Sequence, residues 1–253
     1  MPQFERSWHG INFADLPVKV RANEPADDQF YEAFYASLRG RPVDPDWLRG
    51  KQETGRWLET ELLRKFPAPK ILSVAAGLAV AESEWLAKGY DVTLNECQAE
   101  SLAAVHEKFP SAPLLIGNAH KLEIRGRFDI ITVFTVDYAL NNEDLLEMFR
   151  RLGACLSRGG MVVNQTVNIL TVRRFFAELV KRWLLRRYHT PGWVRWGWNR
   201  SPDAIIALAQ KAGLDLKAQY VKGRNGYRSR SQWLRYLPPL RKPEIIMIFS
   251  RRE

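Results

Sequence analysis

The pattern of apolar and polar residues changes at Lys70, where short apolar runs begin to alternate with amphipathic segments. The apolar runs predict strands, and in chain order they are KILSVA, YDVTLN, PLLIG, FDIITVFT, GGMVVNQT, LDLKAQYV and PEIIMIFSRR. Segments of helical period lie between most of them, for example AESEWLAKG and NNEDLLEMFRRLGACLS. Buried strands that alternate with helices are typical of a parallel sheet covered on both faces. We therefore expect an α/β fold: a doubly wound, mostly parallel seven-stranded sheet with a final antiparallel strand.

Two amphipathic helices are predicted ahead of the first strand. The first covers residues 27–38 and starts with Asp27 and Asp28 as cap residues. The second covers residues 44–66 and is stopped by Pro67. Both precede the alternating region, so they are expected to form an N-terminal extension to it.

The domain boundaries follow from these patterns. Residues 1–25 show no periodicity and predict an irregular lead-in, so residues 1–67 are expected to form the lead-in and helical extension. Residues 68–253 are expected to form the main domain, with cap insertions at about 167–200 and 222–242. The first insertion predicts a long helix followed by a loop rich in tryptophan and arginine.

The helix in the first insertion has two interpretations. It carries apolar residues at helical spacing, namely Phe175, Phe176, Leu179, Val180, Trp183 and Leu184. These residues are typical of a helix packed on a sheet with its arginines solvated. A basic amphipathic helix with tryptophans is also typical of a peripheral contact with an anionic membrane.

Charge is distributed unevenly along the chain. The formal net charge is +10, yet residues 173–242 contain 17 Lys and Arg against three acids, a local +14, which leaves −4 for the remainder. This concentration of positive charge favours an anionic partner. The partner could be an acidic or glycan-like small molecule, an RNA or an anionic membrane surface.

The remaining composition narrows the class of protein. Cys97 and Cys155 are far apart and have no metal-ligand spacing, so we expect neither a metal site nor a disulfide framework. No run approaches the roughly 18 apolar residues of a membrane span, and the N-terminal residues lack the apolar core of a secretory peptide. These features predict a soluble, cytoplasmic protein, with contact at the inner face of a membrane left open.

The segment ILSVAAGLAVAE is the first candidate for a ligand site. It predicts a strand, a tight turn at Gly77 and the start of a helix, an arrangement that presents backbone N–H groups at the carboxyl edge of a parallel sheet. The next strand ends at Glu96, and 96 − 77 = 19 residues separate the two. This is close to the spacing at which an acid receives ribose hydroxyls in nucleotide-cofactor sites.

The order ILSVAAGLAVAE, VTLNE, GNAH, RFDIITVFTVDYAL, RLGACLSRGGMVVN and EIIMIFSRR resembles a class I S-adenosylmethionine-dependent methyltransferase. The resemblance is closest over residues 68–165. It implies S-adenosyl-L-methionine as cofactor, with Ala75, Gly77 and Ala79 facing its methionine part. It also implies that Glu96 accepts hydrogen bonds from the ribose hydroxyls.

Two further segments gain roles from the resemblance. Asn118 and Ala119 are expected to border the adenine, while Thr135, Val136 and Asp137 are expected to line the floor where methyl donor and acceptor meet. The acceptor is expected to be an anionic small molecule or a glycan, lipid-linked ones included. Oxygen rather than nitrogen is expected to be the methylated atom. A hydroxyl acceptor needs a proton acceptor, for which Asp137 and His189 are the candidates.

Two alternatives remain open. One is an RNA methyltransferase, because basic residues interleaved with aromatic ones also suit single-stranded RNA. The other is a non-catalytic binding protein with a degenerate cofactor site. It is motivated by Ala75 and Ala79, which stand where the family usually has glycine, and by Ser73, which stands where it usually has aspartate.

Overall fold

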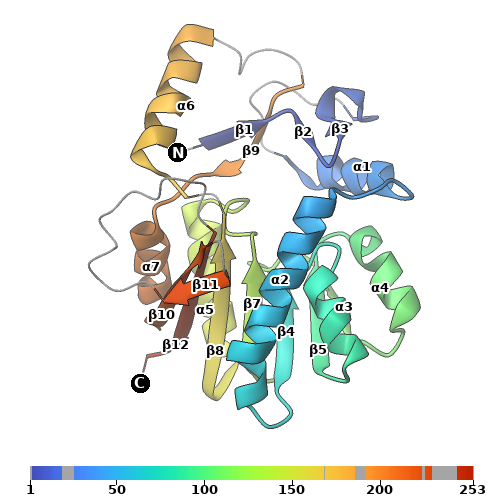
Figure 1. Ribbon diagram of the computed structural model, residues 1–253, viewed down its shortest axis with the longest axis vertical. Coiled ribbons are helices and arrows are strands. Elements are labelled where there is room, and N and C mark those ends of the chain that lie inside the picture. The colour runs from blue at the N-terminus through green and yellow to red at the C-terminus, as the bar shows by residue number, and fades with distance from the viewer. Residues whose placement is uncertain are drawn as a thin grey trace.

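The computed structural model describes residues 2–18, 26–167, 169–185, 192–223, 226–229 and 244–252 (Figure 1). Its centre is an eight-stranded sheet with the order β11-β10-β12-β8-β7-β4-β5-β6. The strands are β4 (Lys70–Val74), β5 (Asp91–Glu96), β6 (Leu114–Ile116), β7 (Phe128–Phe134), β8 (Leu156–Thr166), β10 (Leu214–Gly223), β11 (Gly226–Ser229) and β12 (Ile245–Arg251). Strands β6, β5, β4, β7 and β8 run parallel, whereas β12, β10 and β11 pair antiparallel. The α/β class and the mostly parallel sheet are confirmed.

The predicted number of seven strands is wrong, because β11 adds an eighth. Its residues, GYRS, contain no apolar run, and it pairs with the end of β10 across a short hairpin, with Lys222 opposite Tyr227. A strand at the edge of a sheet needs no buried face, so the apolar pattern could not reveal it. The expected cap at 222–242 therefore begins as sheet, and residues 224–225 and 230–242 of it lie outside the described residues.

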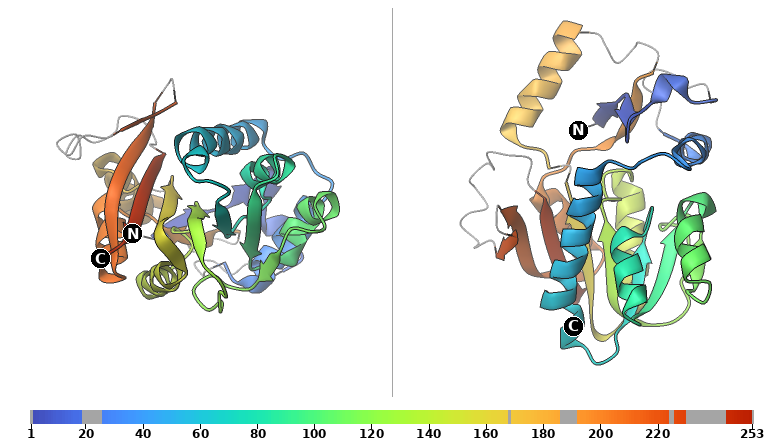
Figure 2. Two further views of the ribbon diagram at one scale, coloured as in Figure 1. Left: turned by 90° about the horizontal axis from the view of Figure 1, so that it is seen from below. Right: turned by 45° about the vertical axis from the view of Figure 1, so that its right-hand side comes forward.

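Helices cover both faces of the sheet (Figure 2). On one face, α2 (Pro45–Glu61), α3 (Val80–Ala87) and α4 (Ala103–Lys108) share a core with the strands. On the other face, α5 (Asn142–Ala154) and α7 (Pro202–Lys211) form a second core. These two cores fix the strands whose carboxyl ends carry the candidate site.

Helix α2 lies very close to α3 at Gly55. A Cβ atom at this position would be 2.7 Å from the Cβ atom of Ala81, so only glycine permits the observed approach. The indole of Trp85, fully buried on α3, donates a hydrogen bond to the Gly55 carbonyl at 3.2 Å. This contact fixes the position of α2 along the sheet, and α2 in turn carries side chains into the site.

The N-terminal residues are more regular than the sequence predicts. They form β1 (Pro2–Glu5), β2 (Ser7–Trp8), β3 (Ile11–Asn12), a short 3-10 turn η1 (Phe13–Asp15) and the helix α1 (Asp28–Leu38). Strand β1 pairs antiparallel with β9 (Val194–Trp198), in the region predicted to be a loop. Each strand is short and gains its order from a partner almost 200 residues away, which local periodicity cannot detect.

An aromatic cluster joins these distant segments into a roof above the sheet. Trp196 of β9 is 6% exposed and stacks on Phe13 with ring centroids 5.3 Å apart. Phe30 of α1 and Trp8 of β2 contact the same indole edge-on. The tryptophan-rich segment after Pro191 thus finds its partner surface in the N-terminal residues.

Helix α6 (Val172–Leu185) stands at the top of Figure 1, clear of the sheet. Its apolar face is exposed, since Phe176 is 58% and Trp183 82% exposed, and Val172, Phe175, Leu179 and Val180 are exposed as well. The interpretation in which these residues pack on the sheet is therefore wrong. Among the described residues, no helix is long and apolar enough to cross a membrane.

Candidate functional site

The carboxyl ends of β4, β5, β6 and β7 open into a cavity of about 570 Å³, which we call the first cavity. Its walls include Ala75, Gly77, Glu96 and Asn118 from the loops that follow these strands. Side chains of helices α1 and α2 also line the cavity. Its volume is that of a site for a small molecule or cofactor.

The loop after β4 adopts a left-handed backbone three times. The φ angles of Ala75, Gly77 and Ala79 are +51°, +58° and +48°. Alanine tolerates this region at a cost of about 1–2 kcal/mol per residue, so the two alanines keep a turn that glycine would form without strain. Ala75 lines the first cavity, whereas Ala79 is fully buried and begins α3.

Glu96 is held in a fixed orientation at the end of β5. Its Oε2 accepts a hydrogen bond from the Gly77 N–H at 2.8 Å, and its Oε1 accepts one from the Cys97 N–H at 2.7 Å. The side chain is 5% exposed and lines the first cavity. The 19-residue spacing seen in the sequence thus corresponds to a direct contact between the two strand ends.

A buried acid accompanies Ser73, the residue that replaces the family's aspartate. The Ser73 hydroxyl donates to Glu82 Oε1 at 2.5 Å, and both side chains are buried. Burial raises the pKa of Glu82, although the hydrogen bond from Ser73 and the nearby Lys51 ammonium lower it. Helix α3 thus supplies a carboxyl group next to the strand position where the acid is missing.

The far end of the first cavity is built by the loop after β6. Asn118, Ala119 and His120 line it. The Asn95 amide fixes this loop, because its Nδ2 donates to the carbonyls of Leu115 at 2.8 Å and Gly117 at 3.0 Å. The expected adenine-side residues therefore lie in the same cavity as Glu96.

Thr135, directly after β7, lies at the meeting point of two cavities. Its φ is +60°, a strained value for a β-branched residue that is commonly found at functional sites. A second cavity of about 480 Å³ adjoins the first, and both are lined by Thr135, Lys51 and Tyr138, together with Trp8, Trp47 and Trp196. One continuous space thus has two compartments.

Several residues of the site were missed by sequence reasoning. Tyr31 and Tyr35 of α1 and Trp47 and Lys51 of α2 line the first cavity, although both helices were interpreted only as an extension. Lys51 is four residues after Trp47 on the apolar stripe of α2. A lysine on the apolar stripe of a helix is unusual, and this was the sequence signal that could have identified Lys51 as a site residue.

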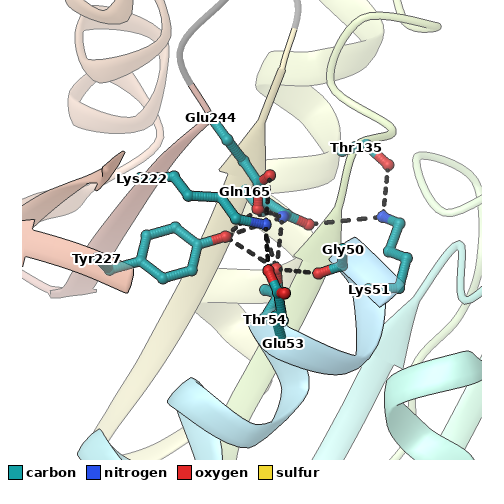
Figure 3. A network of polar contacts seen from close by, with 9 residues as sticks. All are labelled: Gly50, Lys51, Glu53, Thr54, Thr135, Gln165, Lys222, Tyr227 and Glu244. Atoms are coloured by element: carbon teal, nitrogen blue, oxygen red, sulfur yellow. Dashed lines mark hydrogen bonds and ion pairs between the residues drawn. The ribbon is translucent and has the colours of Figure 1, made fainter. Parts of the chain in front are cut away.

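A polar network borders the second cavity (Figure 3). Thr54 of α2 contacts the Tyr227 hydroxyl at 2.8 Å and donates to Glu244 Oε1 at 2.9 Å. Glu244 also accepts hydrogen bonds from Gln165 and Tyr227 and forms an ion pair with Lys222 at 3.4 Å. The network ties α2 to the carboxyl end of β8 and to the hairpin of β10 and β11.

The two predicted catalytic residues stand differently in the structure. Asp137 is 2% exposed and is absent from the lining of either cavity, while His189 lies outside the described residues. Burial raises the pKa of Asp137 to about 6, although the neighbouring Thr166 hydroxyl and Arg200 lower it. Its position favours a structural role beside Arg200.

The Asp137→Asn variant tests this role through pH. The folded state holds the carboxyl at a pKa of about 6, above its unfolded value of roughly 3.9, so the stability it contributes is complete below pH 3.9 and lost as the pH rises through 6. The variant should be more stable than the wild type at pH 7, by on the order of 1–3 kcal/mol, and this gain should vanish near pH 4.

Urea denaturation at the two pH values measures the effect. Asp215→Asn is the matched control, because the hydrogen bond from Arg252 lowers the pKa of this exposed carboxyl and its loss should not stabilise the chain. An equal stability change for Asp137→Asn at pH 4 and pH 7 would contradict the assignment.

Among the described residues, no three His, Cys, Asp or Glu side chains gather into a group that could hold a metal ion.

The strand order, the left-handed loop after β4 and the acid at the end of β5 together define the class: the chain has the fold of the class I S-adenosylmethionine-dependent methyltransferases. A TehB-like S-adenosylmethionine-dependent methyltransferase from Corynebacterium glutamicum is similar to it, with a TM-score of 0.58 and 15% identity over 88% of this chain and 97% of that one. Magnesium protoporphyrin IX methyltransferase from Synechocystis PCC 6803, solved with bound S-adenosylhomocysteine, has a TM-score of 0.59 and 9% identity over 88% and 94%.

A third similar structure is the mitomycin 7-O-methyltransferase MmcR, with a TM-score of 0.58 and 16% identity. The match covers 89% of this chain but 58% of that protein. No protein-family model matches the sequence, and no curated protein matches it. The likeness thus confirms the fold that the sequence predicts.

Proposed function

We propose that the chain is an S-adenosylmethionine-dependent methyltransferase that methylates an oxygen atom of a small-molecule or glycan acceptor. The observation that carries the proposal is the Glu96 carboxylate, braced by two backbone N–H groups at the wall of the first cavity. A carboxylate oxygen accepts two hydrogen bonds, so Glu96 Oε2 retains one acceptor position for a ribose hydroxyl. Glu96 Oε1 also accepts from the Cys97 thiol at 3.0 Å, so a second ribose hydroxyl takes the place of that thiol.

The residues present fit this cofactor. The first cavity persists with Ala75 and Ala79 in place, because the Ala79 methyl group is buried outside its lining and the loop keeps its left-handed backbone. Tyr31 and Tyr35 add aromatic walls, and Asn118 and Ala119 offer polar and backbone groups at the far end. This fit weighs against a degenerate, non-binding site.

When bound, the cofactor supplies an electrophilic methyl group on a sulfonium. The chain itself needs no nucleophilic side chain and contributes mainly by aligning the two reactants and excluding water. Trp8 of β2, Trp196 of β9 and Tyr138 of the loop after β7 line both cavities, and their apolar rings keep water from the junction where the two reactants meet.

Calorimetric titration of the purified protein with S-adenosylhomocysteine tests the proposal. Saturable binding at one site per chain is the expected result. An absence of binding would favour the non-catalytic alternative. Binding of S-adenosylhomocysteine together with methylation of an RNA oligonucleotide, at a rate that falls steeply with salt, would favour the RNA alternative.

We further propose that α6 rests on an anionic membrane surface, as a lipid-linked acceptor would require. Its exposed apolar face has no partner among the described residues, and residues 172–187 contain six Lys and Arg against one acid, Glu178, which is 6% exposed. Apolar side chains that enter the interface, flanked by cations that attract anionic lipid, are typical of peripheral helices.

Sedimentation with vesicles measures this contact. We expect the protein to bind vesicles that contain phosphatidylglycerol and not vesicles of phosphatidylcholine alone. The double variant Phe176→Glu, Trp183→Glu should lower partitioning about 100-fold, because two large apolar side chains no longer enter the interface. Ile116→Glu, at another exposed apolar residue, is the matched control. Unchanged binding by the double variant would contradict the proposal, and concentration-dependent dimerisation through α6 would replace it.

A further inference from the structure

Lys51 occupies the boundary between the two cavities, and the following inference rests on the proposed function. Its Nζ donates to Thr135 Oγ1 at 2.9 Å and to Gln165 Oε1 at 3.5 Å (Figure 3). The ammonium also lies 5.7 Å from the Trp47 ring centroid and 5.5 Å from that of Phe134. A side chain in this position can reach a molecule in either compartment.

The surroundings of Lys51 favour loss of its proton. Among the described residues, no carboxylate lies within ion-pair distance of Nζ. Burial lowers the pKa of Lys51 to about 8. The more distant Glu82, Glu244 and Asp137 raise the pKa and Lys222 lowers it. About half of the lysine is therefore neutral at pH 8, compared with less than about 1% of a lysine in water.

The second cavity has walls that suit an uncharged ring with several hydroxyl groups. Trp8, Trp47 and Trp196 line it. Trp8 and Trp196 are stacked on neighbouring aromatic rings, whereas Trp8 and His9 contact the Trp47 ring edge-on. Trp47 is therefore the wall on which the C–H face of a sugar ring packs. Gln3, Ser7 and Gln165 supply amide and hydroxyl groups at the same wall, and these fix the orientation of a polar ligand.

Charge in the second cavity does not favour an anion. Its carboxylates are Glu5, Asp46 and Glu244, against the two cations Lys51 and Lys222. Lys222 is already paired with Glu53 and Glu244. The local charge therefore suits a neutral acceptor, whatever the charge of the region at 173–242.

We propose that the second cavity binds the acceptor as a glycan-like ring and that the neutral amine of Lys51 takes the proton of the hydroxyl group that becomes methylated. As the acceptor oxygen bonds to the methyl carbon, the carbon–sulfur bond breaks with its electron pair left on sulfur, and the hydroxyl proton passes to the Nζ lone pair. The ammonium then returns this proton to water. Thr135, through its hydrogen bond, holds Nζ at the boundary.

The ring site is tested without cofactor by tryptophan fluorescence, using a panel of p-nitrophenyl hexosides as quenching probes. Saturable quenching by at least one hexoside is expected, because three tryptophans line the cavity. The variant Val167→Trp fills the second cavity, since Val167 lines it and not the first, and should abolish quenching while S-adenosylhomocysteine still binds. No saturable quenching across the panel, or quenching that survives in Val167→Trp, would overturn the acceptor site.

The state of Lys51 is tested by its reactivity with acetic anhydride as a function of pH, read by mass spectrometry. Half-maximal labelling of Lys51 is expected near pH 8, below the roughly 10.4 of a lysine in water. Lys65, an exposed lysine of the 3-10 turn Leu63–Lys65 after α2, is the control for reagent access. A midpoint for Lys51 equal to that of a lysine in water would overturn the proton-acceptor role.

Kinetic measurements then distinguish a Lys51 amine that accepts a proton from a Lys51 ammonium that acts only through its positive charge. With a hexoside acceptor, Lys51→Met and Lys51→Arg should both lower kcat about 10²–10⁴-fold and remove the rise of activity between pH 7 and pH 9. Arginine keeps the charge but does not deprotonate, so full activity in Lys51→Arg would overturn the role. S-adenosylhomocysteine should bind both variants, and Lys65→Met should behave as wild type. Failure of the wild type to bind S-adenosylhomocysteine would instead refute the proposed function.

Discussion

Replacing Glu96 with alanine is expected to weaken S-adenosylhomocysteine binding about 100-fold. The variant removes two hydrogen bonds from ribose hydroxyls to a carboxylate, each worth about 1.5 kcal/mol, and 3 kcal/mol corresponds to a factor of about 100. It also frees the N–H groups of Gly77 and Cys97, which Glu96 holds in the absence of ligand. Calorimetric titration of wild type and variant gives the two dissociation constants.

Two further variants sharpen this measurement. Glu96→Gln keeps one acceptor oxygen and should lose about half of the binding free energy that alanine loses. Glu100→Ala removes an acid four residues away whose side chain is 48% exposed and lies outside both cavities, so it should bind as wild type. Equal binding by Glu96→Ala and Glu100→Ala would exclude Glu96 from the cofactor site.

The Arg200→Met variant should lower the free energy of unfolding by about 3 kcal/mol. Arg200 is 6% exposed, and its guanidinium donates to Asn142 Oδ1 at 2.9 Å and to the carbonyls of Asp137 at 2.5 Å and Leu140 at 2.6 Å. Methionine fills similar space but leaves these acceptors and the buried Asp137 carboxyl uncompensated. Urea denaturation at pH 7 measures the loss.

Arg252→Met provides the contrast for this prediction. Arg252 also donates to a carboxylate, that of Asp215, but its side chain is 54% exposed, so its removal should leave the unfolding free energy almost unchanged. A similar small loss for Arg200→Met would mean that the loop after β7 keeps its shape without the arginine.

The central sheet was predictable because each of its main strands is an apolar run that periodicity detects. The position of the candidate site was predictable for the same reason, because the carboxyl ends of parallel strands meet at one edge of a sheet. The residues that follow these strands, Gly77, Glu96, Asn118 and Thr135, accordingly line one cavity. The left-handed backbone of Ala75 was not predictable, because alanine carries no signal for it.

The second cavity was beyond prediction because three distant segments build it. Trp8 belongs to β2, Lys51 to α2 and Trp196 to β9, and only the pairing of β1 with β9 brings the first and last together. The exposed face of α6 was beyond prediction for a related reason. An apolar stripe shows that a helix is amphipathic but does not show which surface its apolar face contacts.

The pairing of β1 with β9 also has a consequence for synthesis on the ribosome. Phe4 pairs with Arg195, 195 − 4 = 191 residues later, so at 5–20 residues per second the partner strand emerges about 10–40 s after β1. Trp8 and Phe13 meet Trp196 only then. We therefore expect the roof to close only after the five parallel strands from β4 to β8 have emerged, with β10, β11 and β12 still to follow. Until then, the nascent N-terminal aromatic residues are expected to be clients of chaperones that shield apolar segments.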